Sequence, residues 1–339
     1  MPIMASRRSG FAVGKVPPEI LSRTVYSRLG RKDRRVIVGP GIGRDSAAVK
    51  YNKKILVFTS DPVTGTPSNI GQHSVEINAN DVAVTGARPK WYLCTILLPI
   101  GTTKTALDTI AAEIHDTATK LGISVIGGHT EATPGLNRPL ISGFMIGEST
   151  GRVLTAGQGK QGDRVLLTKT AGLEGTAILA KDKASLLRTK GVSQAVMRVA
   201  QSYQSQISVV AEALLATRIH GVHALHDPTE GGILNGLWEI AVASKLGITV
   251  YADVVPVATA TQRVCMALGL DPLKLMSSGS LLLAVKRSRC QAVQKALARS
   301  RIVTTQIGVL TSLSQGRFVV RNGQRRPLVA VPKDELYRI

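Results

Sequence analysis

The chain has 339 residues, of which 44% are hydrophobic and 33 are glycine, and its formal net charge at pH 7 is +21. This composition favours a well-folded α and β protein that is too long for a single core. It has no run of 18 apolar residues, and no apolar block follows Arg7 and Arg8, which argues against a membrane span and a secretory signal. We therefore expect a cytoplasmic protein.

The cysteines and the basic residues argue against three further classes. Cys94, Cys265 and Cys290 lie far apart and form no CxxC pair, which argues against a disulfide framework and against a zinc site. The basic residues are scattered and aromatic residues make up only 4% of the chain, so stacking platforms for single-stranded nucleic acid are missing. We interpret most of the positive charge as solvated surface, which would still attract a nucleotide.

In chain order, the first expected elements are a short helix at 19–29 and a strand at 35–38 that leads into a glycine-rich loop. Gly41 and Gly43 precede Asp45 in this loop, and glycines after a strand let backbone amides approach a phosphate. However, Arg44 stands where the dinucleotide fingerprint needs its last glycine, and the chain has no P-loop motif. A tight turn is therefore the alternative interpretation.

Two acidic residues follow in the next elements. A buried strand at 55–58 is expected to deliver Asp61 to its C-terminal end, where α and β folds commonly place functional groups. Asn80 and Asp81 then stand side by side on an apolar helix that Gly86 and Pro89 end. A buried, unpaired carboxylate is costly, so Asp81 needs water, a partner or a cation.

The first half is completed by strands at 91–98, 123–126 and 140–147 and by an amphipathic helix at 105–121. After the strand at 123–126 comes Gly127-Gly128-His129-Thr130-Glu131, which we interpret as a polar turn. It could position a ligand, or His129 could be an ordinary loop histidine. A segment rich in Gly, Gln and Lys near 155–163 predicts a domain boundary, with domains at 1–154 and 155–339.

The second half is expected to begin with a strand at 164–168 that is followed by Lys169, and residues 182–220 are mostly helical. Asp227 and Pro228 then lead through Gly231 and Gly232 into a helix at 233–241. A helix N-terminus with free amides favours an anion, although a plain capped helix start is equally compatible with this pattern. The remaining expected elements are strands at 248–257, 279–286, 302–309, 318–321 and 328–331 and a helix at 289–299.

Taken in order, these motifs resemble the aminoimidazole-ribonucleotide-synthetase (PurM-like) superfamily over nearly the whole chain. Its members include the purine-pathway ligases, selenophosphate synthetase, thiamine-monophosphate kinase and HypE. The stretches 227–232, 238–241, 255–257 and 268–272 look most like HypE and archaeal HypE-like, AIR synthase-related proteins. Each motif is weak by itself, whereas the ordered set is specific.

The resemblance implies an α+β, two-domain fold in which an N-terminal α+β domain contributes its sheet to a dimer barrel and a C-terminal domain forms an α/β sandwich. It implies a homodimer with ATP in the cleft between the domains, and Mg2+ held by Asp45, Asp61 and Asp81. The residues implied to contact ATP are Gly41, Gly43, Asn80, Gly127, Gly128, Asp227, Gly231 and Gly232. The resemblance also implies catalytic roles for Lys169, His129 and Glu131.

Two departures from the family pattern matter. Arg44 replaces an acidic residue, which could weaken metal binding or contact phosphate directly. The chain ends Asp334-Glu335-Leu336-Tyr337-Arg338-Ile339, without the C-terminal cysteine of HypE, which is carbamoylated and then dehydrated to a thiocyanate at the expense of ATP. We therefore do not expect that cyanide-forming chemistry.

The first hypothesis is an ATP- and magnesium-dependent enzyme that phosphorylates an amide- or carbonyl-type oxygen of an unknown acceptor. A small-molecule kinase similar to thiamine-monophosphate kinase is the second. A non-catalytic, nucleotide-binding scaffold with a protein partner is the third.

Overall fold

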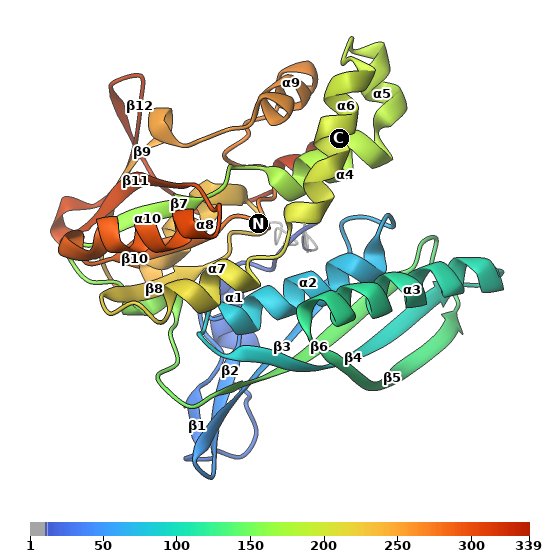
Figure 1. The fold of residues 1–339 in the computed structure, drawn as a ribbon, viewed down its shortest axis with the longest axis horizontal. Coiled ribbons are helices and arrows are strands. Elements are labelled where there is room, and N and C mark those ends of the chain that lie inside the picture. Colours follow the sequence, from blue (N-terminus) through green and yellow to red (C-terminus); the bar gives the residue numbers. More distant parts are fainter. Residues whose placement is uncertain (1–10, 12) are drawn as a thin grey trace, which may run out of the picture.

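The computed structural model describes residue 11 and residues 13–339. Within them the chain folds around two sheets, one built from each half of the sequence (Figure 1). The first sheet has the strand order β1-β2-β3-β6-β4-β5, and the second has the order β13-β12-β9-β11-β7-β10-β8. The first ten residues, on which the prediction about a secretory signal rests, lie outside the described part.

The first half contains α1 (Pro18–Thr24), β1 (Val36–Val38), β2 (Ala47–Tyr51), β3 (Lys54–Val63), α2 (Ile70–Ala83), β4 (Arg88–Pro99), α3 (Lys104–Leu121), β5 (Ser124–Thr133) and β6 (Leu140–Ser149). Along β3, Val57, Thr59 and Val63 are buried, and Asp61 shares their face because side chains alternate along a strand. Helices α2 and α3 cover this side of the sheet (Figure 1).

Helix α2 is buried on nearly all sides. It packs on β3, β4 and β6, and it also contacts α3 and the second-half helix α7 (Val210–Ala216). Its hydrophobic side chains, such as Val75, Ala79 and Val82, lie in the core, and so do its polar residues Asn80 and Asp81. Every polar group on α2 therefore needs a partner, because water does not reach most of the helix.

The strands of the second half are β7 (Arg164–Thr168), β8 (Val222–His226), β9 (Gly247–Tyr251), β10 (Leu282–Val285), β11 (Thr304–Thr311), β12 (Arg317–Arg321) and β13 (Gln324–Pro327). The helices are α4 (Leu173–Asp182), α5 (Ala184–Thr189), α6 (Gln194–Ser202), α7, α8 (Gly232–Ala243), α9 (Thr259–Leu268) and α10 (Cys290–Arg299). Short 3-10 turns lie at Ala156–Gln158, Tyr203–Gln206, Ala252–Val254, Arg287–Arg289, Leu313–Gln315 and Glu335–Arg338.

The second sheet has a hydrophobic cluster on each face. On β7, Val165 and Leu167 belong to the cluster under α8, whereas Leu166 belongs to the cluster that includes α7 and α10. That second cluster continues into the first half, where it includes Val75 and Val82 of α2. The two halves are thus joined by a continuous apolar core rather than by a flexible contact.

Three sequence-based predictions of elements need correction. The stretch 127–131 is not a turn but lies within β5, because the strand continues to Thr133 by pairing in parallel with β4. Asp61 lies inside β3, not after it, since β3 continues to Val63. The last strand is at Gln324–Pro327 rather than 328–331, because Asn322 and Gly323 form a hairpin turn that pairs it with β12.

The expected two-domain α+β class is confirmed, whereas the exact boundary after residue 154 stays a prediction. Among the described helices, none is long and apolar enough to cross a membrane.

Candidate functional site

Four aspartates from both halves of the chain converge where the halves meet. Asp45 comes from the loop before β2, Asp61 from β3, Asp81 from α2 and Asp227 from the loop after β8. Their carboxylates are close enough for Asp227, Asp61 and Asp45 to raise the pKa of Asp81 in addition to its burial. We call these four residues the aspartate cluster.

The first-half aspartates are held by a threonine and an asparagine. The Thr59 hydroxyl lies 2.7 Å from Asp81 Oδ2 and 2.9 Å from the Asp45 carbonyl oxygen. Asn78 fixes the backbone of Asp61, since its Oδ1 accepts from Asp61 N–H at 3.0 Å and its Nδ2 donates to the Asp61 carbonyl at 3.2 Å. A Cβ at Gly143, the cross-strand partner of Asp61, would lie 2.3 Å from Asn78 Nδ2, so only glycine fits there.

On the second-half side, a buried histidine bridges two carboxylates. His226 Nδ1 lies 3.0 Å from Asp45 Oδ2, and His226 Nε2 lies 2.7 Å from Glu239 Oε2 on α8. Burial alone would lower the pKa of His226, but Asp45 and Glu239 raise it well above its ordinary value. The two carboxylates therefore favour the charged imidazole, which ties Asp45 to the second sheet.

Burial and like charges act against ionisation of the other aspartates. Burial raises the pKa of Asp61 to about 6 and that of Asp227 to about 8, and in both residues the Asp45 carboxylate adds to the shift. Burial acts to raise the pKa of Asp45, but the charge and hydrogen bond of His226 and the charge of Lys15 together lower it. The cluster thus carries more potential negative charge than the neighbouring cations neutralise.

Asp227 gives the strongest indication of a bound cation. Both of its carboxylate oxygens are buried, and neither has a hydrogen-bond partner among the described residues. Asp45, His226 and Asp227 each place one ligand atom within 4.8 Å of the others, but both nitrogens of His226 already face carboxylates, which leaves the two aspartates as ligands. Carboxylate oxygens are the ligands that hard divalent cations prefer, so the donor set fits Mg2+.

Asn80, predicted to contact the nucleotide, has another role in the structure. Its Oδ1 accepts from Val209 N–H at 2.8 Å, and its Nδ2 donates to the Ile207 carbonyl at 3.0 Å. The side chain is fully buried, so both polar groups satisfy the backbone of the second half. The prediction is corrected: Asn80 fastens α2 to the segment before α7, and Asn78 is the asparagine that orders the site.

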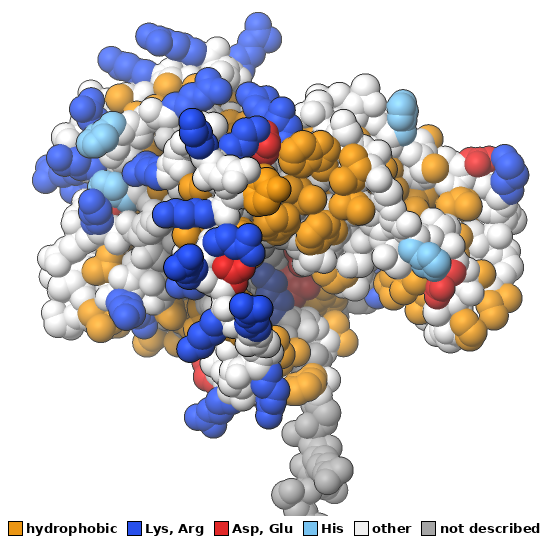
Figure 2. All heavy atoms as spheres, turned by 90° about the horizontal axis from the view of Figure 1, so that it is seen from below, with side chains coloured by type: hydrophobic (Ala, Val, Ile, Leu, Met, Phe, Trp, Pro, Cys, Tyr) orange, Lys and Arg blue, Asp and Glu red, His pale blue; other side chains and the backbone are white. Residues whose placement is uncertain are grey.

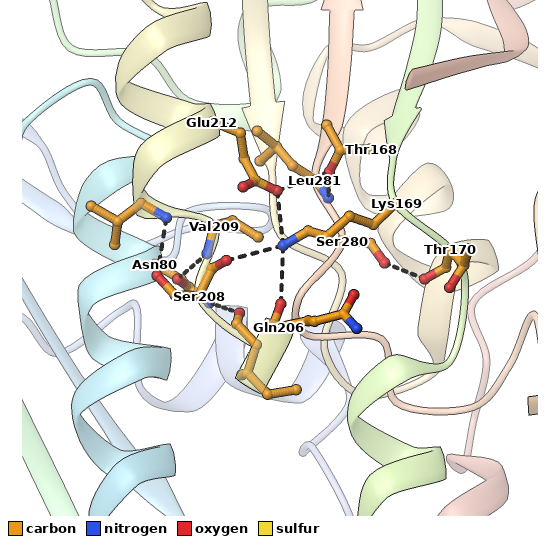
Figure 3. A network of polar contacts seen from close by, with 12 residues as sticks. Asn80, Thr168, Lys169, Thr170, Gln206, Ser208, Val209, Glu212, Ser280 and Leu281 are labelled. Atoms are coloured by element: carbon orange, nitrogen blue, oxygen red, sulfur yellow. Dashed lines mark hydrogen bonds and ion pairs between the residues drawn. The ribbon is translucent and has the colours of Figure 1, made fainter. Parts of the chain in front are cut away.

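Lys169, predicted as a catalytic cation, contacts acceptors of its own half of the chain (Figure 3). Its Nζ donates to the carbonyls of Gln206 and Ser208, both at 3.0 Å, and lies 3.1 Å from Glu212 Oε1. Two hydrogen bonds and one ion pair thus engage the ammonium group. The predicted catalytic role of Lys169 is not supported within one chain, because its ammonium already serves these three acceptors.

His129 and Glu131 do not join the aspartate cluster within one chain. They pair with each other at 3.1 Å on β5, an exposed edge strand. Asp61 aligns through Gly143 and Cys94 with Gly128, which places β5 three strand spacings, or about 14 Å, from Asp61. The expectation that Glu131 extends the cluster is thus wrong for a single chain.

The glycines of β5 have a packing role. A Cβ at Gly128 would lie 2.1 Å from the Cys94 carbonyl oxygen, so Gly128 permits the close approach of β4. Gly127 precedes it on the same exposed strand. Neither glycine lies near the aspartates of its own chain, so their predicted contact with ATP is not supported within one chain.

The loop before Asp45 is folded back on itself. Arg44 Nη1 donates to the Gly39 carbonyl at 3.0 Å, and a Cβ at Gly41 would lie 3.2 Å from the Arg44 side chain. Gly43 has a φ of +65°, and a Cβ there would lie 3.1 Å from that of Ala243. Arg44 therefore binds its own loop, and Gly43 allows close packing on α8. Contact of Gly41 and Gly43 with a nucleotide stays a prediction.

The expected anion site at the start of α8 is occupied by the chain itself. Gly231 N–H donates to Asp334 Oδ2 at 2.6 Å, and Gly232 N–H donates to the Thr229 carbonyl at 3.1 Å. The amides of Gly231 and Gly232 are thus satisfied internally, which corrects their assignment to phosphate. Asp227, four residues earlier, remains at the site.

Sequence reasoning missed His226, Glu239, Thr59 and Asn78. His226 adjoins Asp227, and its adjacency to a candidate ligand was a usable signal. Glu239 lies on α8, and Asn78 lies one turn before the aspartate of α2. Nothing in the local sequence distinguishes these two residues from ordinary polar side chains, because their partners are distant in the chain.

The fold and the site define the class of protein: two α+β units joined by a shared core, with carboxylates of both units at the junction. Matches to family models agree with this class. Residues 43–149 match the model "AIR synthase related protein, N-terminal domain", and residues 160–321 match its C-terminal counterpart. The chain therefore belongs to the AIR synthase related protein family, and the expected PurM-like fold is confirmed. The expected dimer barrel stays a prediction.

Individual relatives are consistent with this assignment. The chain is 30% identical over 286 residues to a putative hydrogenase expression/formation protein of Methanocaldococcus jannaschii, covering 81% of each chain. It is 30% identical over 244 residues to the carbamoyl dehydratase HypE of Escherichia coli K12, covering 71% of this chain and 69% of that protein.

Solved structures share the fold. HypE in complex with ATP matches with a TM-score of 0.71 at 21% identity, covering 96% of this chain and 98% of that one. The thiamine monophosphate kinase of Aquifex aeolicus matches with a TM-score of 0.68 at 18% identity, covering 91% and 97%.

Proposed function

We propose that the protein is an ATP- and magnesium-dependent enzyme that phosphorylates an amide- or carbonyl-type oxygen of a small acceptor. The observation that carries this proposal is Asp227 at the junction of the two halves, whose two buried oxygens lack hydrogen-bond partners within the described part of the chain. A buried carboxylate of this kind costs free energy unless a cation binds it. The sequence relationship to HypE and the ATP-bound HypE of the same fold favour Mg-ATP as the source of that cation.

In this proposal Asp45, Asp61, Asp81 and Asp227 hold magnesium, which supplies charge neutralisation for the phosphates. His226 holds Asp45 in place from the second half, while Thr59 and Asn78 hold Asp81 and Asp61 from the first. Because ligands come from both halves, the nucleotide would lie between them. Pre-positioned carboxylates need little rearrangement when the phosphates arrive.

The reaction follows from this arrangement. An acceptor oxygen forms a bond to the γ-phosphorus as the bond to the β,γ-bridging oxygen breaks, and ADP leaves. The phosphorylated oxygen is then a good leaving group for a later dehydration or ligation. The acceptor is not a thiol of the described residues, because Cys94, Cys265 and Cys290 are all buried.

The kinase alternative is kept because thiamine monophosphate kinase has the same fold. The two reactions differ in the fate of the phosphoryl group: a kinase leaves it on a stable product, whereas the proposed enzyme releases it as inorganic phosphate. The test uses calorimetry for Mg-ATP binding, followed by phosphate release with candidate acceptors. Absence of binding, or an unchanged nucleotide affinity in Asp81→Ala, would overturn the proposal and favour a scaffold role.

We also propose a homodimer formed through the first sheet. The face of this sheet opposite α2 carries Phe58 and Phe144, whose ring centroids lie 6.2 Å apart, and the edge strand β5 exposes Val125 and Ile126. Figure 2 shows hydrophobic side chains gathered on the underside of the molecule, beside a region dense in Lys and Arg. A monomeric mass in light scattering would contradict this proposal.

A further inference from the structure

The N-terminal arm, residues 13–17, brings a lysine to the aspartate cluster. Lys15 N–H donates to Glu230 Oε2 at 3.2 Å, and Lys15 Nζ donates to Thr229 Oγ1 at 3.3 Å. Both partners belong to the loop that carries Asp227, more than 200 residues away in sequence. The arm is not part of either sheet and ends at the Pro17–Pro18 start of α1.

Glu230 is held from two directions. The Tyr337 hydroxyl donates to Glu230 Oε1 at 2.9 Å, while the arm occupies Oε2. Gly14 has a φ of +113°, and a Cβ built there would lie 3.5 Å from Glu230 Oε2. Glycine thus lets the arm turn beside the Glu230 carboxylate. The backbone of Lys15, which donates to the same carboxylate, is therefore held next to the loop that carries Asp227.

The ammonium of Lys15 lies in the field of the cluster. Desolvation by itself would lower its pKa, but Glu239, Asp45, Asp61 and Glu230 together raise it well above the ordinary value. Lys15 in turn acts to lower the pKa of both Asp45 and Asp61. The lysine therefore adds a positive charge beside these carboxylates, in addition to that of His226 on Asp45.

Three other cations, Lys169, Arg44 and His226, already have partners of their own. Lys169 gives its protons to Gln206, Ser208 and Glu212, and Arg44 binds its own loop. His226 is locked between Asp45 and Glu239. Lys15 has one long side-chain hydrogen bond, and residues 13–15 are exposed, so its ammonium can move by rotation of the side chain alone.

We infer that Lys15 is a catalytic residue whose ammonium neutralises the aspartate cluster in the empty site and moves onto the terminal phosphoryl group when Mg-ATP binds. This inference rests on the proposed function. A flexible, compact point charge suits both tasks, because it can leave the carboxylates once a metal replaces it. On the nucleotide it would stabilise the charge that develops as the γ-phosphoryl group is transferred.

If Lys15 has both roles, removing its charge should strengthen the binding of Mg2+ alone and weaken the binding of Mg-ATP. In Lys15→Gln, Mg2+ alone should bind several-fold more tightly by calorimetry, because no lysine competes for the carboxylates. The affinity for Mg-ATP should fall by about tenfold, as expected for loss of a hydrogen bond to a charged group. The affinity for Mg-ADP should change by less than about twofold, because ADP lacks the terminal phosphate. Phosphate release should fall by on the order of 10²-fold.

Two further variants complete the experiment. Lys15→Arg should retain most of the Mg-ATP affinity because it keeps the charge. Lys53→Gln removes the same charge from the exposed turn between β2 and β3 and should match wild type in every assay. Thermal melting should be the same for all variants, since the arm makes few contacts.

The outcomes separate the inference from the proposed function. If wild type binds and turns over Mg-ATP but Lys15→Gln does so equally well, the lysine inference alone fails. Equal weakening of ATP and ADP would also overturn it, because the charge would then act on an inner phosphate. If wild type binds no Mg-ATP, the proposed function fails and the lysine inference fails with it.

Discussion

The polar network around Lys169 and the aspartate cluster differ in whether their polar atoms have partners within the protein. Around Lys169, the ammonium and its acceptors are mutually satisfied within the chain (Figure 3). In the aspartate cluster, neither carboxylate oxygen of Asp227 has a hydrogen-bond partner among residues 13–339, and burial raises the pKa of Asp61. A satisfied network stabilises the fold, whereas an unsatisfied one requires a ligand.

The largest effect is expected for Asp227→Asn, which should lower activity and raise stability. Asp227→Asn should lower magnesium-dependent phosphate release by on the order of 10²–10³-fold. Without Mg2+ at neutral pH, the same change should raise the free energy of unfolding by about 1–3 kcal/mol, because the buried Asp227 must take up a proton on folding and an amide need not. Urea denaturation and a phosphate-release assay measure the two effects.

The matched control is Asp116→Asn, an exposed position on α3 that should change neither quantity. Loss of stability in Asp227→Asn without Mg2+ would mean that the carboxylate has a partner within the protein, and the distinction between site and scaffold would fail there.

Lys169→Met should show the reverse pattern. It leaves Glu212 buried without its cation, which costs about 3–5 kcal/mol in the free energy of unfolding. Mg-ATP affinity, measured well below the melting temperature, should stay within about twofold of wild type. Adding Glu212→Gln should recover part of the stability. A large loss of turnover with unchanged stability would restore Lys169 as a catalytic residue.

Asn80→Ala tests a smaller part of the scaffold. The change leaves Ile207 C=O and Val209 N–H without their partner, and a buried unsatisfied group costs about 1–3 kcal/mol. We expect a lower midpoint in urea and a nucleotide affinity that falls far less than in Asp81→Asn. Equal losses of affinity in the two variants would place Asn80 in the site after all.

The smallest effect is the pH dependence of stabilisation by Mg2+. Folding raises the pKa of Asp61 to about 6 and of Asp227 to about 8, so the metal-free protein loses stability as pH rises from about 4 through these values. Mg2+ binds the ionised carboxylates, so its stabilising effect should grow by about 1–3 kcal/mol over the same range. Melting curves with and without Mg2+ at pH 5.5 and 8.5 measure this growth. If Mg2+ raised the melting temperature equally at the two pH values, Asp61 and Asp227 would be excluded as its ligands.

The sequence predicted much of the fold because its signals are local. Hydrophobic periodicity located α3 and α8, and strand patterns located β3, β4 and β6, although the ends shifted by several residues. The GGHTE stretch was misread as a turn because glycines and polar residues are typical of turns. Only its pairing with β4 along the sheet edge keeps it extended.

The candidate site was predicted in part for the same reason. Asp45, Asp61, Asp81 and Asp227 stand in motifs whose order resembles a known superfamily, and the structure brings them together. Lys169, Asn80 and Gly231 stand in equally suggestive motifs, yet the structure gives each an internal partner. Those partners lie 37 to 129 residues away in sequence, so no local pattern could reveal them.

By itself, the sequence determined the α+β class, the order of the motifs and the acidic character of the site, because these depend on residue type and spacing. Tertiary structure alone decided which polar residues are satisfied and which are left for a ligand. It did so because hydrogen-bond satisfaction depends on groups that meet only after folding. That distinction separates Asp227 from Asn80, and it places Lys15 of the N-terminal arm beside the aspartate cluster.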